Sequence, residues 1–135
     1  MAVVVYNYQK VTHEQLENCI KWCQNKFNLR DWKISLETGE NYPEQLGNKD
    51  DDDIGSCFSN PDFLKVTIWV PILLHKKENK NSYQTCIHEM IHVLTVGVGR
   101  IDSDKSEIVS YRFDSLLYIL YCIENKLKIA NENED

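Results

Sequence analysis

The spacing of apolar side chains predicts an N-terminal helix followed by a strand. Between residues 12 and 27, apolar residues and cysteines recur three or four positions apart, and Thr12 stands where an N-cap belongs. This spacing is typical of an amphipathic helix. Trp32, Ile34 and Leu36 then alternate with polar residues, which indicates a strand with one buried face.

A polar segment separates this strand from a second strand-like region. Residues 38–55 contain glycines, a proline and the acidic run Asp50–Asp53, and we expect a long loop there. The acidic run lacks the spaced oxygen ligands and the glycine of a calcium loop, so we interpret it as solvated. Strand-like residues stand on both sides of the turn signal Asn60-Pro61-Asp62, and the stronger strand is Leu64–Val70. An antiparallel pair is their simplest arrangement.

Two helices complete the predicted fold. The first begins with Ser82 as its cap and keeps helical period to Gly97, where Gly97 and Gly99 should end it. The second runs from Ser103 to Lys128, ahead of a frayed tail at 129–135. Its apolar residues form one face: Val109, Phe113, Leu116, Leu120, Ile123 and Leu127. The order of helix, small antiparallel or mixed sheet, helix and helix predicts an α+β fold.

Composition and charge narrow the class of protein. With 135 residues the chain has the size of one domain, which we expect to span residues 1–135, and its 42% hydrophobic and 27% charged residues suggest a soluble protein. The net charge is −6 and the basic residues are scattered, so nucleic acid is not expected as a partner. No stretch approaches the roughly 18 apolar residues of a membrane span, and the start does not resemble a signal peptide.

The five cysteines also bear on location. They are odd in number and dispersed along the chain, which indicates reduced thiols and a cytoplasmic protein. Cys19 and Cys23 share one helix face, and we interpret them as core residues because no second cysteine or histidine pair stands at zinc-site spacing.

The helix predicted at 82–97 contains His88-Glu89-Met90-Ile91-His92, which matches the motif H-E-x-x-H. Residues four apart lie one helical turn above each other, so two imidazoles can reach one zinc ion at about 2.0–2.1 Å. Glu89 is rotated by about 100° from His88, which suits a general base better than a ligand. Zinc would lower the pKa of a bound water to about 7, and Glu89 could take its proton and pass it to a leaving amine. The alternative interpretation is a polar helix face with surface pairs only.

A catalytic zinc needs a third protein ligand. The extended motif H-E-x-x-H-x-x-G-x-x-H is excluded, because Thr95 and Val98 occupy the places of its glycine and its last histidine. Cys57, in Gly-Ser-Cys-Phe-Ser, shares a short likeness with the cysteine motif of peptide deformylases. Cys57 is therefore one candidate ligand.

Glu107 is the other candidate. It stands fifteen residues after His92, near the start of the next helix, and the intervening glycines and polar residues give the chain room to reverse. Glu107 could instead be the capping-box partner in Asp104-Lys105-Ser106-Glu107. Asp102 or Asp104 would then be the substitute ligand.

The motif, Glu107 and the segment Asp31-Trp32-Lys33-Ile34 resemble the gluzincin metallopeptidases, in particular their minimal single-domain and small phage-type members. The resemblance covers about residues 30–115. It implies a zincin-like fold, Zn2+ held by His88, His92 and Glu107, and hydrolysis of a peptide or protein substrate. It also implies that an extended peptide binds along an edge strand, here Leu64–Val70, for which a core strand is a second and compatible interpretation.

The sequence departs from this family at one position. Better-known members carry an aspartate four residues after the ligand glutamate, whereas this chain has Tyr111, with Asp114 a turn later. An oxyanion stabiliser is also expected near the zinc, and the candidates are Tyr111, Arg112, His75 and Tyr118. Tyr111 shares the helix face of Glu107, so we take it, with Glu89, as a catalytic candidate; half-buried packing is its alternative role.

Three functions fit these residues. The first is a cytoplasmic zinc metallopeptidase with Glu89 as its base. The second is a zinc-bearing binding or regulatory module with a peptidase-like fold and no general proteolysis. The third is a deformylase-like amide hydrolase that holds its metal with Cys57, His88 and His92.

Overall fold

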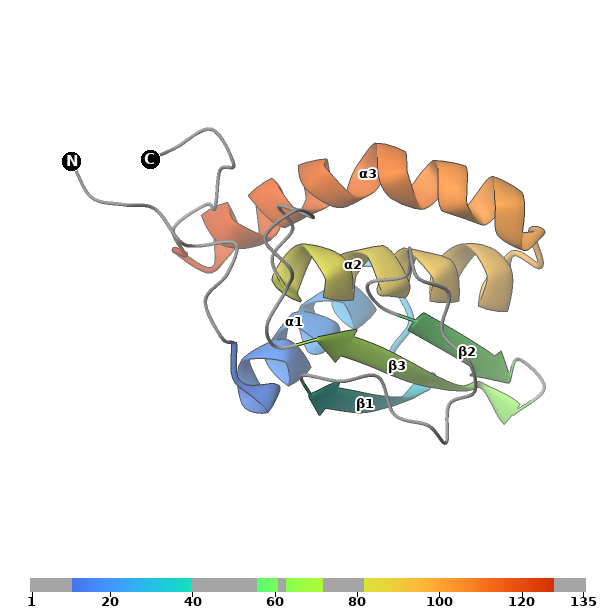
Figure 1. Cartoon of the computed structure of the whole chain (residues 1–135), viewed down its shortest axis with the longest axis horizontal. Helices are drawn as coiled ribbons and strands as arrows, with labels where there is room; N and C mark the ends of the chain where they lie inside the picture. The colour runs from blue at the N-terminus through green and yellow to red at the C-terminus, as the bar shows by residue number, and fades with distance from the viewer. Residues whose placement is uncertain (1–10, 40–55, 61–62, 72–81, 128–135) are drawn as a thin grey trace.

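The computed structural model describes residues 11–39, 56–60, 63–71 and 82–127. Its elements are α1 (His13–Lys26), β1 (Lys33–Gly39), β2 (Ser56–Asn60), β3 (Lys65–Pro71), α2 (Ser82–His92), the π-helical segment η5 (Val93–Val98) and α3 (Ser103–Glu124). Figure 1 shows α2 between the sheet and α3, with α1 packed beside α2. The predicted α+β class is confirmed. Outside the described residues lie the loop 40–55, the turn residues 61–62, His75 and the tail 129–135.

α1 has the cap and the buried face that its sequence predicts. Thr12 Oγ1 accepts a hydrogen bond from the Gln15 amide at 3.1 Å, and Gln15 Oε1 accepts one from the Thr12 amide at 2.8 Å. This capping box satisfies two backbone N–H groups at the helix start. The buried face consists of Leu16, Cys19, Ile20 and Cys23. The two cysteines are thus core residues as predicted, and none of the five cysteines forms a disulfide.

The three strands form one sheet in the order β1-β3-β2. β2 pairs with β3 in antiparallel fashion, as predicted for the strands on either side of the turn at 60–62. β1, for which no direction was predicted, runs parallel to β3. A parallel pair needs a long connection, which the chain has between β1 and β3. The strand Leu64–Val70 was predicted as an edge strand, and this is wrong because β3 is central. β1 also extends through Gly39, two residues into the predicted loop.

α2 begins at Ser82 and passes without a break into η5, which ends at Val98 with Gly99 as its C-cap. The predicted stop at Gly97 and Gly99 is therefore confirmed for Gly99, whereas Gly97 is a buried residue within η5. The Gly99 amide donates to the Leu94 carbonyl at 3.1 Å, the five-residue step of a π-helix. A Cβ on Gly99 would lie 2.8 Å from the Thr95 carbonyl oxygen, which explains the need for glycine there.

α3 starts where predicted, but the side that it buries lies opposite the predicted apolar face. Asp102 is the N-cap, and its Oδ1 accepts from the Lys105 amide at 3.0 Å. The helix ends at Glu124 rather than Lys128. Its buried residues are Ser106, Ser110, Asp114, Tyr118, Tyr121 and Cys122. Most of the predicted apolar face is exposed instead: Phe113, Leu116, Leu120, Ile123 and Leu127. The polar side faces inward because it carries the partners of the two motif histidines, as described below.

One hydrophobic core joins the three helices to β3. Val66, Ile68 and Val70 of β3 meet Ile87 and Met90 of α2 in this core, so β3 is a core strand. Burial of such side chains provides most of the free energy that holds the layers together. Among the described residues, no helix combines the length and the apolar composition required to cross a bilayer.

Candidate metal centre

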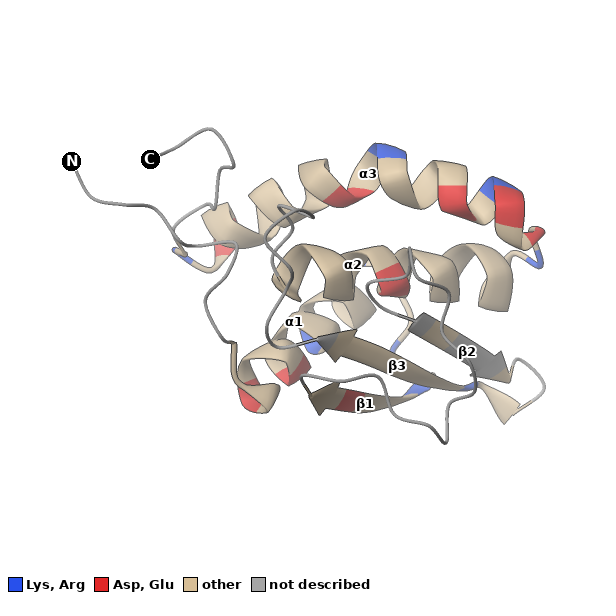
Figure 2. Cartoon of the chain, viewed as in Figure 1, with Lys and Arg blue, Asp and Glu red and all other residues tan. Residues whose placement is uncertain are grey.

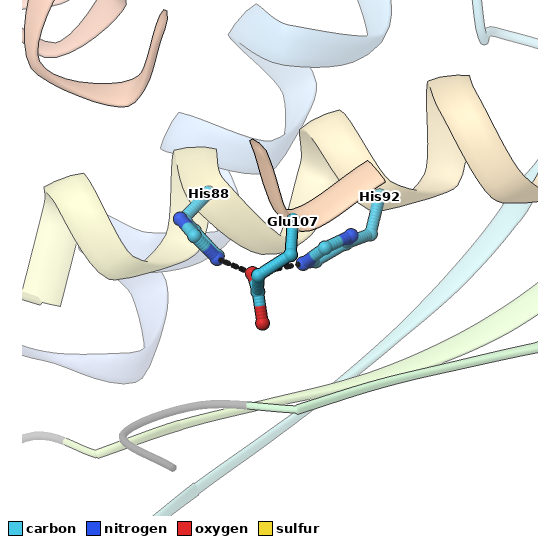
Figure 3. Close-up of side chains that lie close together, drawn as sticks. All are labelled: His88, His92 and Glu107. Carbon is cyan, nitrogen blue, oxygen red and sulfur yellow. Dashed lines mark hydrogen bonds and ion pairs between the residues drawn. The ribbon is translucent and has the colours of Figure 1, made fainter. Parts of the chain in front are cut away.

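Three side chains from two helices converge on one point beside α2 (Figure 3). His88 Nε2 lies 2.7 Å from Glu107 Oε1, and His92 Nε2 lies 3.0 Å from the same oxygen. All three potential ligand atoms lie within 4.8 Å of one another. The structure therefore brings together the three residues proposed as metal ligands, and the atoms that meet are ones that can bind a metal.

The local fold explains this convergence. His88 and His92 are one turn apart on α2, and their ring centroids are 5.0 Å apart. The chain reverses after Gly99, and the Asp102 cap starts α3 so that Glu107 falls in its second turn, facing α2. Because Asp102 caps the helix and bonds to Lys105, the capping-box role proposed for Glu107 with Asp104 is wrong. Glu107 points to the histidines instead.

Asp114 orients the first imidazole. Its Oδ2 lies 2.8 Å from His88 Nδ1, and both side chains are buried. A carboxylate only accepts, so Nδ1 carries the proton, and in the neutral imidazole Nε2 then holds its lone pair toward Glu107. Gln84 Nε2 donates to the other Asp114 oxygen at 3.0 Å, which holds the carboxylate in place. Carboxylate support of this kind is typical of metal-binding histidines.

The second imidazole is supported by hydroxyl groups. His92 Nδ1 lies 2.6 Å from Ser106 Oγ, and Ser106 Oγ lies 2.6 Å from Thr95 Oγ1. Burial, and then the neighbouring His88, lower the pKa of His92, which outweighs the opposite effect of Glu107. His92 is therefore neutral at neutral pH, as a metal ligand must be.

The donor set fits a zinc ion. Two imidazole nitrogens and one carboxylate oxygen are the protein ligands of a common class of catalytic zinc sites. Ligand atoms around a tetrahedral zinc are about 3.3 Å apart, so Glu107 Oε1 would need to withdraw by roughly half an ångström. The Glu107 side chain is 46% exposed and can make that adjustment. Without a cation, His88 could satisfy both neighbouring carboxylates only as an imidazolium with a proton on each nitrogen.

The two catalytic candidates lie near this group but outside it. Glu89 is a buried residue of α2, next to His88 in the chain, and is not one of the three clustered residues. Tyr111 is on α3, and its ring centroid is 4.7 Å from that of His88 in an edge-on arrangement. The tyrosine is 60% exposed, so half-buried core packing does not describe it.

The other candidates lie elsewhere. Arg112 is exposed, whereas Tyr118 is buried in the core. Cys57 is a partly buried residue of β2 and does not belong to the clustered group, which removes the geometric support for a deformylase-like site. Asp102 and Asp104 are likewise outside the group.

Sequence reasoning assigned no supporting role to four residues of the site: Gln84, Thr95, Ser106 and Asp114. Asp114 was noted a turn after Tyr111, and its place seven residues after Glu107, two turns along the same helix face, is the signal that could have assigned it. Ser106 and Thr95 carry no comparable signal, since isolated hydroxyl residues occur throughout any chain.

Comparisons of the chain with models of known protein families, with curated proteins and with solved structures find no match. What the protein does must therefore be argued from the chemistry of this site.

Proposed function

We propose that this protein is a zinc-dependent metallopeptidase of gluzincin type, with zinc held by His88, His92 and Glu107. The observation that carries the proposal is the meeting of His88 Nε2, His92 Nε2 and Glu107 Oε1 beside an H-E-x-x-H helix. The contact that each imidazole makes at Nδ1 strengthens the proposal, because it leaves Nε2 available to bind a metal.

The chain supplies the groups that peptide hydrolysis requires. Zinc, when bound, would acidify a water molecule and polarise the scissile carbonyl. Glu89 follows His88 directly, and in this proposal its carboxylate would accept a proton from the attacking water and deliver it to the leaving amine. Tyr111, whose ring packs edge-on against His88, is the candidate for stabilising the developing oxyanion.

The sheet offers a place for an extended peptide. β2 is an edge strand, and it packs against α2 and η5, the segments that carry and follow the motif. A peptide that added as a further strand beside β2 would therefore run past the candidate metal centre. This proposal moves the peptide-binding role from β3, where the sequence suggested it, to β2.

The test combines metal content with hydrolysis. Plasma mass spectrometry should find one zinc per chain in the wild type and none in His92→Ala or Glu107→Ala, while Asp104→Ala, an exposed acid on the same helix, should keep its zinc. The zinc-loaded wild type should cleave members of a random peptide library, and Glu89→Gln should retain zinc but lose at least a thousandfold in rate. Zinc binding without any cleavage by the wild type would instead favour a binding module, and absence of zinc would end the proposal.

A further inference from the structure

The buried hydroxyl groups of Ser106 and Thr95 form a chain that connects His92 to the backbone of α2. Ser106 is fully buried, and Thr95 is 8% exposed in η5. Three short contacts link the chain: His92 Nδ1 to Ser106 Oγ at 2.6 Å, Ser106 Oγ to Thr95 Oγ1 at 2.6 Å, and Thr95 Oγ1 to the Ile91 carbonyl oxygen at 2.9 Å. This hydrogen-bond chain contains two hydroxyl protons, and it ends on a carbonyl oxygen, which can only accept.

The carbonyl at the end of the hydrogen-bond chain determines the donor and the acceptor of every hydrogen bond in it. The Ile91 carbonyl can only accept, so the Thr95 hydroxyl donates to it. Thr95 has no second proton, so its oxygen accepts from the Ser106 hydroxyl. The Ser106 oxygen then has its own proton committed to Thr95 and can only accept from His92. The proton of His92 must therefore sit on Nδ1.

We infer that Ser106 and Thr95 are positioning residues that hold His92 as the Nδ1–H tautomer, so that Nε2 presents its lone pair to the metal. This inference rests on the zinc site proposed above, although not on its catalytic activity. It gives the two histidines different supports, because a buried carboxylate, Asp114, fixes His88, whereas neutral hydroxyl groups fix His92.

The arrangement gives Thr95 an influence on His92 through the Ser106 hydroxyl. If the Thr95 hydroxyl is removed, the Ser106 proton loses its acceptor and can turn toward His92 Nδ1. His92 would then carry its proton on Nε2, where it blocks metal binding. The π-helical segment thus contributes to the site through one hydroxyl group.

The experiment reads the tautomer and the zinc affinity separately. The tautomer is read in metal-free protein that carries Glu107→Ala, so that no carboxylate lies 3.0 Å from His92 Nε2. There, long-range ¹H–¹⁵N correlation spectra should show His92 protonated on Nδ1 when Thr95 is present and substantially on Nε2 when Thr95→Val is added. Zinc affinity, measured by competition with a chromophoric chelator, should fall 10- to 100-fold in both Ser106→Ala and Thr95→Val. Thr95→Ser keeps the hydroxyl and should restore affinity to near the wild-type value.

Two comparisons distinguish the hydrogen-bond chain from a packing effect. Ser110→Ala removes another fully buried hydroxyl from the same face of α3, one with no hydrogen-bond partner among the described residues, and should leave zinc affinity unchanged. The double variant Ser106→Ala with Thr95→Val should bind zinc no more weakly than Ser106→Ala alone, because the two residues act in series.

Additive losses in the double variant, or an Nε2–H tautomer of His92 in the metal-free Glu107→Ala background, would overturn the inference. An Nδ1–H tautomer in that background, together with a wild type that binds no zinc, would contradict the metal site and leave the hydrogen-bond chain in place. The two failures are therefore distinguishable.

Discussion

Asp114 Oδ2 lies 2.8 Å from His88 Nδ1 in a buried contact, although the aspartate stands seven residues after Glu107 and not four. The intervening turn places Tyr111 beside the His88 ring, at the position where the resembled family has its aspartate. The same function, orientation of the first imidazole, is thus available from one helical turn further along α3.

This contact predicts that Asp114→Asn weakens zinc binding. An amide lacks the negative charge that raises the basicity of His88, so zinc affinity should fall about 10- to 100-fold. Competition with a chromophoric chelator measures the loss. Asp104→Asn, in the exposed first turn of the same helix, is the matched control and should bind zinc as the wild type does. Equal affinities for Asp114→Asn and the control would show that the contact does not support a ligand.

Zinc should stabilise the folded chain through the same three residues. A ligand at 100 times its dissociation constant adds about 2.7 kcal/mol to the free energy of unfolding, which is on the order of 10 °C in Tm for a domain of this size. Thermal unfolding with and without zinc measures this shift. Glu107→Ala should abolish the shift, whereas Glu89→Gln should keep it because Glu89 is not among the clustered ligands. A shift that survives in Glu107→Ala would place the zinc elsewhere.

The features that the sequence predicted correctly depend on local signals. Thr12 is the N-cap of α1 as predicted, because its bonding partner Gln15 lies within one turn of it. The H-E-x-x-H spacing brings His88 and His92 together on any helix, whatever surrounds it. Glu107 needed a chain reversal as well, and the glycine and polar residues after His92 indicated one.

The features that were missed depend on distant parts of the chain. The direction of β1 relative to β3 is determined by how the connection between them crosses, and no residue within either strand specifies it. Likewise, apolar periodicity identifies a buried face only where the interior is apolar. α3 buries Ser106 and Asp114 because the two histidines of α2 lie opposite them. Apolar periodicity therefore selected the wrong face of α3 as the buried one.

The corrected face of α3 can be tested by two substitutions on the same helix. Tyr121 is buried against Trp22 and Tyr83, with ring centroids 5.1 and 5.4 Å away, whereas Ile123 is 64% exposed. Tyr121→Ala should lower the free energy of unfolding by about 3 kcal/mol, whereas Ile123→Ala should change it by no more than about 0.5 kcal/mol. Urea unfolding measures both losses. A large loss for Ile123→Ala with a small one for Tyr121→Ala would restore the face predicted from the sequence.

The buried thiols predict how stability changes with pH. Burial, followed by a hydrogen bond with Cys23, raises the pKa of Cys19 well above its ordinary value of 9.0, and burial also raises that of Cys23. In the unfolded chain these thiols lose protons near their ordinary pKa, whereas in the folded chain they keep them. The folded state then binds more protons, so its stability is unaffected below about pH 8.5 and falls as pH rises toward the folded-state pKa.

Unfolding free energies measured by urea titration at pH 8, 9 and 10 should therefore decline. Above pH 9 each such thiol contributes a slope that approaches about −1.4 kcal/mol per pH unit. Cys19→Ala should be less stable than the wild type at pH 8, because the substitution leaves a cavity. Its unfolding free energy should nevertheless decline less steeply with pH, by up to the slope that one thiol contributes. Parallel pH profiles for the wild type and Cys19→Ala would mean that Cys19 ionises as readily in the folded chain as in the unfolded one, contrary to its complete burial in the core.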